Sequence, residues 1–284
     1  MNRVLLAGAT GYLGSYVTTE LLKRGFSTRL LVRKPGLVKQ EGGNTAEIFQ
    51  AELTQPNSLK GACSDIDTVI STVGITKQKD GLSYMDVDYQ ANMNLLSEAK
   101  KDGVKKFIYV SVLNGENLRQ LEICEAKERF VEQLKNSGLA YCVIRPNGFF
   151  SDMAEFQAMA KKGRIYLFGN GESKSNPIHG ADLAEVCVDA MEKPGREINI
   201  GGPETLTHNE IAELAFASLG RDAKISYIPN PVRLAVLKML RLFTPARVYG
   251  PVEFFMTVMA MDMVAPAYGK HTLDSFFNSL SNRN

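Results

Sequence analysis

The segment that decides the fold is VLLAGATGYLGSYVTTELLKRG, residues 4–25. The apolar run at its start predicts a buried strand, and apolar residues recurring at helical spacing after it predict a helix that ends at Gly25. Between strand and helix stand Gly8, Gly11 and Gly14, which allow a sharp turn, close approach of a pyrophosphate and close helix–strand packing. The helix N-terminus would then face the phosphates. The segment predicts a dinucleotide site; the alternative is a tight structural turn without a ligand.

The composition is that of an ordinary globular protein. The chain has 284 residues, 44% hydrophobic and 23% charged, with a net charge of +2. This length suits one large domain, or a large and a small one, and the near-neutral charge argues against a nucleic-acid partner. The four cysteines are far apart and form no CxxC pair. We therefore expect neither a metal site nor a disulfide framework, and a reducing, cytoplasmic location.

No targeting or membrane-spanning segment is expected. The first predicted strand begins at residue 4, which leaves no room for a signal or transit peptide before it. No stretch of about 18 apolar residues free of charge occurs, so no transmembrane helix is predicted.

The end of the second predicted strand, residues 28–32, indicates the cofactor. In a dinucleotide fold an acidic residue at this point binds the ribose 2′-hydroxyl of NAD, whereas a basic residue accommodates the 2′-phosphate of NADP. Here Arg33 and Lys34 follow the strand. We therefore expect NADP(H) to be preferred over NAD(H); the alternative is a solvated basic loop.

Strands and helices alternate through the first two thirds of the chain. Further strands are predicted at 47–51, 67–74, 107–111, 140–144 and 197–202. Helices are predicted at 57–63, 86–101 and 122–136, and a polar loop over the site at 77–83. This alternation is typical of an α/β protein with a doubly wound parallel sheet, the Rossmann fold, which we expect over residues 1–202.

Residues 203–284 change character and predict a smaller, mainly helical part that binds a substrate or a partner. Thr207 and Glu210 form a capping-box pattern at the start of a helix. The segment 252–264 is rich in methionine and phenylalanine, which suits either an apolar ligand pocket or plain core packing. The segment 232–243 is apolar with interspersed cations, so a peripheral contact with a membrane surface is a further possibility.

Together, the glycine spacing, Arg33 and the segments 86–111, 145–150 and 177–184 resemble the atypical branch of the short-chain dehydrogenase/reductase superfamily, nearest to its NmrA-like NAD(P)H-binding group. The resemblance extends from residue 1 to about residue 200 and is loose beyond. In the last of these segments Asp182 is expected to cap a helix, and His179 to be structural rather than catalytic.

The resemblance implies where the cofactor lies. Glu52 stands where many relatives have an aspartate near the adenine, the exit of the fourth strand runs along the ribose, and the 145–150 loop holds the nicotinamide. With the glycine turn, the expected cofactor-binding residues are Gly8, Thr10, Gly11, Tyr12, Leu13, Gly14, Arg33, Lys34, Glu52, Leu53, Thr72, Val73, Gly74, Lys127, Pro146 and Phe149.

The usual catalytic pair is incomplete. Typical members of the superfamily carry Tyr-x-x-x-Lys, in which the tyrosine transfers the proton and the lysine binds the nicotinamide ribose and lowers the tyrosine pKa. Lys127 matches the lysine, but Ile123 takes the place of the tyrosine. The usual serine corresponds to Ser111 or, with a shift of one residue, to Val112. The predicted catalytic residues are Lys127 and Ser111.

Two classes of function follow. The first is an oxidoreductase that moves hydride from NADPH to a small apolar acceptor, such as a quinone, an enone or another conjugated double bond. The second is a cofactor-binding protein without turnover, a redox sensor or an assembly factor. The missing tyrosine favours the second class and the ligand-sized C-terminal part favours the first; the oligomeric state stays open.

Overall fold

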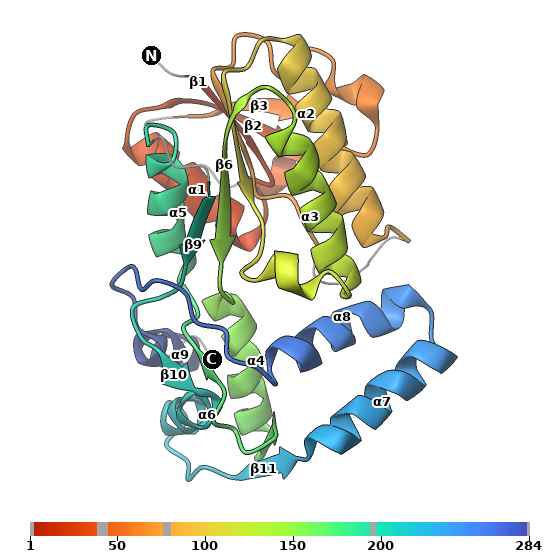
Figure 1. Ribbon diagram of the computed structural model, residues 1–284. Helices are drawn as coiled ribbons and strands as arrows, with labels where there is room; N and C mark the ends of the chain where they lie inside the picture. The colour runs from red at the N-terminus through yellow and green to blue at the C-terminus, as the bar shows by residue number, and fades with distance from the viewer. Residues whose placement is uncertain (1–2, 39–44, 76–80, 194–196, 283–284) are drawn as a thin grey trace. The chain divides into compact units, whose positions relative to one another are not determined.

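The computed structural model describes residues 3–38, 45–75, 81–193 and 197–282, and the chain divides into two compact units. The first unit consists of residues 1–145 and 183–198, and the second of residues 146–182 and 199–284. The chain passes from the first unit to the second after Arg145, returns at Leu183 and leaves the first unit again after Ile198. Figure 1 shows the elements of both units.

A seven-stranded sheet has the order β3-β2-β1-β4-β5-β6-β9. Its strands are β1 (Arg3–Ala7), β2 (Ser27–Val32), β3 (Glu47–Gln50), β4 (Thr68–Ser71), β5 (Lys106–Val110), β6 (Ala140–Pro146) and β9 (Glu197–Ile200). All neighbours from β3 across to β6 pair in parallel. The order reverses between β1 and β4, which is the switch point where doubly wound sheets bind dinucleotides. The predicted α/β fold with a doubly wound parallel sheet is confirmed.

Helices cover both faces of this sheet, as parallel strands require. Figure 1 shows α1 (Tyr12–Lys23) and α5 (Gly180–Asp189) on one face, and α2 (Asn92–Lys101) and α3 (Glu122–Lys135) on the other. Leu5, Val69 and Phe107 lie in register across β1, β4 and β5 and belong to one buried cluster with Leu95 of α2 and Phe130 of α3. Because side chains alternate along a strand, the residues that follow these three on β1, β4 and β5 face the helices on the other side of the sheet.

The helix predicted at 86–101 has an unusual start. Residues Met85–Ala91 (η3) form a stretch of π-helix that runs directly into α2. Such stretches are rare and often occur at functional sites. Short 3₁₀ turns are η1 (Pro35–Leu37), η2 (Pro56–Leu59) and η4 (Gly115–Leu118). The short helix predicted at 57–63 is present only as the 3₁₀ turn η2, which ends at Leu59; Gly61 follows with φ of 79°.

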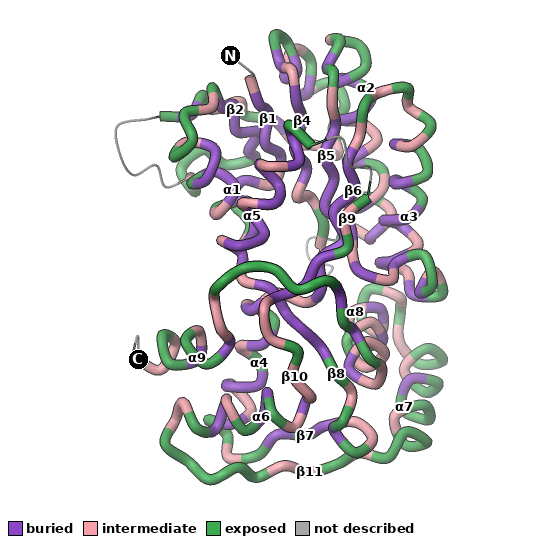
Figure 2. Tube along the Cα trace, turned by 60° about the vertical axis from the view of Figure 1, so that its left-hand side comes forward, coloured by how far each residue is buried: buried purple, intermediate pink, exposed green. Residues whose placement is uncertain are grey.

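The second unit packs three helices around a core of its own. These are α4 (Phe150–Lys161), α6 (His208–Ala217) and α9 (Leu273–Ser281). Phe156, Phe216 and Phe277 are buried among them. Two small sheets complete it, formed by β7 (Ile165–Phe168) with β11 (Ile225–Ile228) and β8 (Lys174–Ser175) with β10 (Leu206–Thr207). The helices α7 (Asn230–Phe243) and α8 (Ala246–Val258) follow β11, and Figure 2 shows how exposed α7 is.

Three local expectations can be compared with the structure. The capping box is confirmed, because the Thr207 hydroxyl accepts the Glu210 N–H at 3.1 Å and the Glu210 carboxylate accepts the Thr207 N–H at 2.7 Å. The strand predicted to end at residue 144 continues through Pro146. Pro146 has no N–H to donate, but this costs no hydrogen bond to β5, because the pairing between β5 and β6 ends at Ile144.

The expected capping role of Asp182 is also wrong. Asp182 lies inside the first turn of α5, and its carboxylate instead accepts the N–H groups of Lys270 and His271 at 3.1 Å each. His271 Nδ1 lies 2.7 Å from the other carboxylate oxygen. This aspartate therefore fixes the backbone before α9, at a sequence distance that no local pattern reveals.

Candidate functional site

The turn between β1 and α1 has no room for side chains at two of its glycines. Gly8 has φ of 90°, and a Cβ there would lie 2.5 Å from the Thr72 hydroxyl oxygen. A Cβ at Gly14 would lie 2.0 Å from the carbonyl oxygen of Gly8. The Gly11 N–H donates to that same carbonyl at 2.9 Å and closes the turn. The helix therefore begins directly against the strand, as the glycine spacing predicts.

The N-terminus of α1 suits an anion. Gly11 is its N-cap, and within the part of the chain that the structure describes no side chain caps this end and no acid occupies the first turn. The first N–H groups of a helix have no partner inside the helix, and the dipole makes this end positive. Thr10 is exposed, whereas Leu13 is buried against the core. The N-terminus of α1 fits the phosphates of a dinucleotide, and so does the glycine turn before it, which leaves no room for a Cβ at Gly8 or Gly14.

The two cations expected to bind a 2′-phosphate follow β2. Arg33 is exposed, and its guanidinium lies 3.8 Å from the Glu52 carboxylate, a long ion pair that a stronger anion can displace. Lys34 is exposed and precedes η1. Glu52 thus contacts Arg33 rather than packing inside, while Leu53 packs against the core of the first unit.

The exit of β4 lies against the glycine turn and against a buried ion pair. The Thr72 hydroxyl donates to the Ala7 carbonyl at 3.1 Å. Val73 packs against the core. A Cβ at Gly74 would lie 2.6 Å from Asp88 Oδ1 and 2.7 Å from Lys127 Nζ. The backbone at Gly74 therefore covers the pair that these two side chains form.

That ion pair is the centre of the candidate site. Lys127 Nζ of α3 lies 2.8 Å from Asp88 Oδ1 of the π-helical stretch, and Asp88 is fully buried. The other Asp88 oxygen accepts the Ile75 N–H at 3.2 Å. Burial by itself lowers the pKa of a lysine, but the Asp88 carboxylate and the Tyr109 hydroxyl more than offset this, so the pKa of Lys127 lies above its ordinary value. The Asp88 carboxylate thus favours the protonated form of Lys127.

Tyr109 does not take the place of the tyrosine that the sequence lacks. Ile123, one turn before Lys127, is buried and has no exchangeable proton. The Lys127 ammonium lies 5.6 Å from the centroid of the Tyr109 ring, on β5. Tyr109 is fully buried, and this burial raises the pKa of its hydroxyl far above the usual value, against the opposing effect of Lys127. Tyr109 thus supports the lysine and does not face a substrate.

Ser111 belongs to a different cluster. Its hydroxyl donates to the Glu128 carboxylate at 3.1 Å, and both residues are buried. Glu128 also accepts the Arg145 guanidinium at 2.9 Å, and that guanidinium donates to Glu197 at 3.1 Å and to Glu116 at 3.0 Å. This network links α3, the end of β6 and β9. The two predicted catalytic residues therefore have different partners: Ser111 is hydrogen-bonded to Glu128, and Lys127 is paired with Asp88.

Two expected nicotinamide contacts belong to the second unit. Pro146 ends β6, and Phe149 is the N-cap of α4, where it forms a parallel bridge with Ile178. His179 stacks on His271 with ring centroids 4.2 Å apart. Its Nδ1 accepts the N–H of Ala181 at 3.2 Å, an arrangement in keeping with a structural role.

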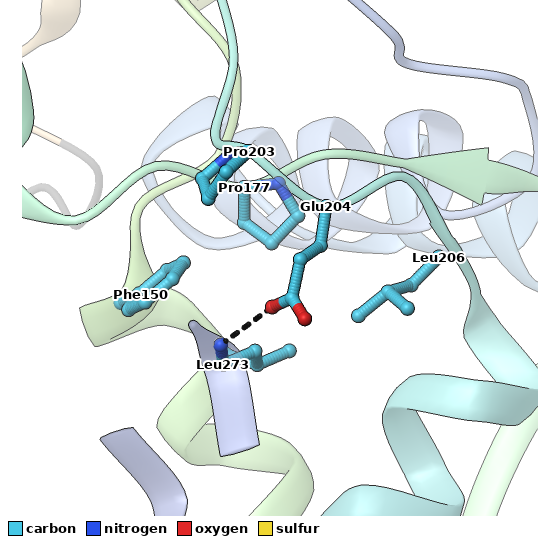
Figure 3. A pocket seen from close by; sticks show the side chains of 6 residues that line it. All are labelled: Phe150, Pro177, Pro203, Glu204, Leu206 and Leu273. Atoms are coloured by element: carbon cyan, nitrogen blue, oxygen red, sulfur yellow. Dashed lines mark hydrogen bonds between the residues drawn. The ribbon is translucent and has the colours of Figure 1, made fainter. Parts of the chain in front are cut away.

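The hollow in the second unit is small. It is lined by Phe150, Pro177, Pro203, Glu204, Leu206 and Leu273 (Figure 3). The Glu204 carboxylate accepts the Leu273 N–H at 3.0 Å and so holds the start of α9. The space is about 160 Å³ with the solvent at its mouth included, less than the ~300–1,000 Å³ typical of ligand sites. Of the methionine-rich segment, Met259 is part of the second unit's core.

Within the described ranges no three Cys, His, Asp or Glu side chains are grouped to hold a metal ion. The four cysteines are free and buried. Among the helices that the structure describes, none combines the length and apolar character needed to cross a bilayer.

A model of an NAD(P)H-binding family matches residues 8–194, which is more than half of the chain and includes the glycine turn, Arg33 and Lys127. Divinyl chlorophyllide a 8-vinyl-reductase of Cucumis sativus is 27% identical over 97% of this chain and 75% of its own length. Photosystem II assembly factor Ycf39 of Guillardia theta is 29% identical over 80% of this chain and 73% of its own length.

A solved structure confirms the fold. The NADPH-dependent quinone oxidoreductase QOR2 of Escherichia coli, complexed with NADPH, superposes with a TM-score of 0.76 at 18% identity, over 98% of this chain and 99% of that one. The predicted resemblance to atypical short-chain dehydrogenases is confirmed at the level of NAD(P)H binding. The chain belongs to the NAD(P)H-binding family that matches residues 8–194.

Proposed function

We propose that the protein is an NADP(H)-dependent reductase that transfers hydride to a small apolar acceptor, a quinone, an enone or another conjugated double bond. The observation that carries this proposal is the Lys127–Asp88 ion pair beneath Gly74, 2.8 Å long and buried at the exit of β4. It fixes one protonated group in the unit that also presents the open N-terminus of α1.

The first unit offers a contact for each charged part of the cofactor. The N–H groups at the start of α1 would bind the pyrophosphate. Arg33 would release Glu52 and, with Lys34, bind the 2′-phosphate, since charge-assisted hydrogen bonds to phosphate are stronger than a long carboxylate pair. Lys127 would bind the nicotinamide ribose, as the resemblance implies. When bound, the reduced nicotinamide supplies the hydride.

The proposed class of acceptor follows from the absence of the tyrosine that normally acts as general acid. With Ile123 in place of a tyrosine and Tyr109 buried, neither of these two positions offers a hydroxyl that Lys127 could orient to protonate a developing alkoxide. Loss of a general acid typically costs about 10²–10⁴-fold in rate. A conjugated acceptor spreads the incoming charge over several atoms, so water can supply the proton. The fixed positive charge of Lys127 would stabilise that charge electrostatically.

The names of the relatives support two candidate functions, a reductase and a cofactor-binding protein without turnover. The Cucumis sativus relative is named as a reductase of a vinyl group, a carbon–carbon double bond. The Guillardia theta relative is named as an assembly factor, which supports a second candidate, a cofactor-binding protein without turnover. One structural observation favours this second candidate: the hydroxyls of Ser111 and Tyr109 are both buried, and the Ser111 hydroxyl already donates to Glu128.

An acceptor screen separates the two candidates. NADPH oxidation would be measured anaerobically over quinones, enones, vinyl arenes and aldehydes, with wild type, Lys127→Met and the surface control Lys101→Ala. A reductase should turn over conjugated acceptors but not simple aldehydes. Lys127→Met should lose most of this activity and Lys101→Ala should keep it. Micromolar NADPH binding without turnover of any acceptor would establish the second candidate instead.

A further inference from the structure

The helix α7 directs its apolar face outward. Val232, Val236, Met239 and Phe243 follow one another at spacings of four, three and four residues and so form one stripe. All four are exposed, and Phe243 is 78% exposed; next to it, Leu242 is 69% exposed. Leu237 is the one residue of α7 that is buried. In Figure 2 the tube of α7 is therefore largely in the exposed colour.

Two of the three charged residues of α7, by contrast, contact α8. Figure 1 shows α7 and α8 joined as a helical hairpin. Arg241 pairs with Glu253 of α8 at 2.6 Å, and Glu253 is buried. Arg233 donates to the carbonyl oxygen of Met256 at 3.3 Å. These contacts fix the rotation of α7 on α8, and with it the outward direction of the apolar stripe.

The charge around the stripe has one sign. Residues 230–258 contain four cations and one carboxylate, a net charge of +3 in a chain whose total is +2. The single carboxylate, Glu253, is buried against Arg241, whereas Lys238 and Arg247 are exposed. A helical hairpin that exposes both an apolar stripe and cations is complementary to an anionic lipid surface. Two copies facing each other would bring like charges together.

We propose that the α7–α8 hairpin docks the protein on an anionic lipid bilayer, with α7 lying in the plane of the interface. The apolar stripe would enter the boundary between headgroups and acyl chains, while Lys238 and Arg247 would bind acidic headgroups. A helix of 14 residues is too short to span a bilayer. The proposal holds equally for a reductase and for a cofactor-binding protein without turnover.

Vesicle flotation tests the proposal on the full chain. The protein should float with equimolar phosphatidylglycerol–phosphatidylcholine vesicles and much less with pure phosphatidylcholine, and high salt should weaken the binding. Leu242→Ser with Phe243→Ser should weaken binding at least about tenfold, because both side chains lose their transfer free energy. The matched control is Leu37→Ser, whose side chain is 63% exposed in the first unit and should not matter.

A fluorescence measurement reports the depth of insertion directly. The chain contains no tryptophan, so Phe243→Trp introduces a single probe. Its emission should shift to the blue with anionic vesicles, whereas Leu37→Trp should not shift. Absence of vesicle binding by wild type overturns the proposal and leaves a protein partner for this face. A blue shift without vesicles, together with a dimer in light scattering, overturns it in favour of self-association.

Discussion

The Lys127 ammonium and the Asp88 carboxylate lie 2.8 Å apart, and the carboxylate is fully buried. They are brought together by a π-helical stretch and by α3, and Gly74 covers them because a side chain there would collide with both. A buried ion pair is a costly feature to keep unless the charge has a use. The resemblance implies a use for the charge of Lys127, which is to bind the nicotinamide ribose.

A double-mutant cycle should show this coupling. Lys127→Met leaves a buried carboxylate without a partner and should lower the free energy of unfolding by about 3–5 kcal/mol. The double variant Lys127→Met/Asp88→Asn should recover most of this loss, because no unpaired charge remains. Urea denaturation of the wild type, both single variants and the double variant checks it. Strictly additive losses would show that the two side chains are not coupled.

The glycine turn makes a second prediction. Gly14→Ala places a Cβ against the Gly8 carbonyl oxygen, so α1 must move off the strand. We expect the free energy of unfolding to fall by at least about 2 kcal/mol and NADPH binding to be lost. Gly36→Ala is the matched control, since its Cβ meets no atom within 4 Å. Equal NADPH affinity of Gly14→Ala and wild type would place the cofactor elsewhere.

Arg33 should decide between the two cofactors. A charge-assisted pair to the 2′-phosphate contributes about 1.5–3 kcal/mol, which corresponds to roughly 10- to 150-fold in affinity. Arg33→Ala should therefore weaken NADPH binding by about this factor and leave NADH binding almost unchanged, in titrations of both cofactors. Arg129→Ala, on the surface of α3, should change neither. A wild type that binds the two cofactors equally would refute the preference.

Because His208 is buried, we expect the free energy of unfolding to decrease in mild acid. Burial lowers its pKa from 6.5 to about 4 in the folded protein. Between these two values the unfolded chain binds a proton that the folded protein does not, so stability decreases as the pH falls. The full effect is about 3 kcal/mol at 1.36 kcal/mol per pKa unit.

The checks on His208 are direct. His208→Gln should flatten the dependence of unfolding free energy on pH over this range, even if the variant is less stable overall. An NMR titration of the His208 ring in the folded protein should give a midpoint near pH 4. A midpoint near the ordinary value would show that the side chain is solvated.

The glycine turn and Lys127 could be predicted because each is recognised from a short stretch of sequence. The turn at Gly8, Gly11 and Gly14 needs only local geometry, and Lys127 follows from its spacing to the missing tyrosine. The partner Asp88 escaped prediction because it lies 39 residues before the lysine. One signal was present: Asp88 and Asn92, four residues apart, place polar groups on an otherwise apolar helix face, and both are fully buried.

Other parts could not be read from local patterns. The Ser111–Glu128–Arg145 network joins residues from three elements. The helix α4 was missed because it follows Pro146 and Gly148, which suggested a loop. The loop predicted over the site at 77–83 falls largely outside the described residues. The cytoplasmic location and the preference for NADP(H) stay predictions.

The most direct test of the central claim follows the hydride itself. Wild-type protein would be incubated with an accepted enone and NADPH deuterated at C4 of the nicotinamide, in separate reactions for the two faces. The account predicts that one of the two yields a reduced product with one deuterium, by mass spectrometry, and that Lys127→Met yields far less. If NADPH binds but neither reaction transfers deuterium to any conjugated acceptor, the protein is not the reductase proposed.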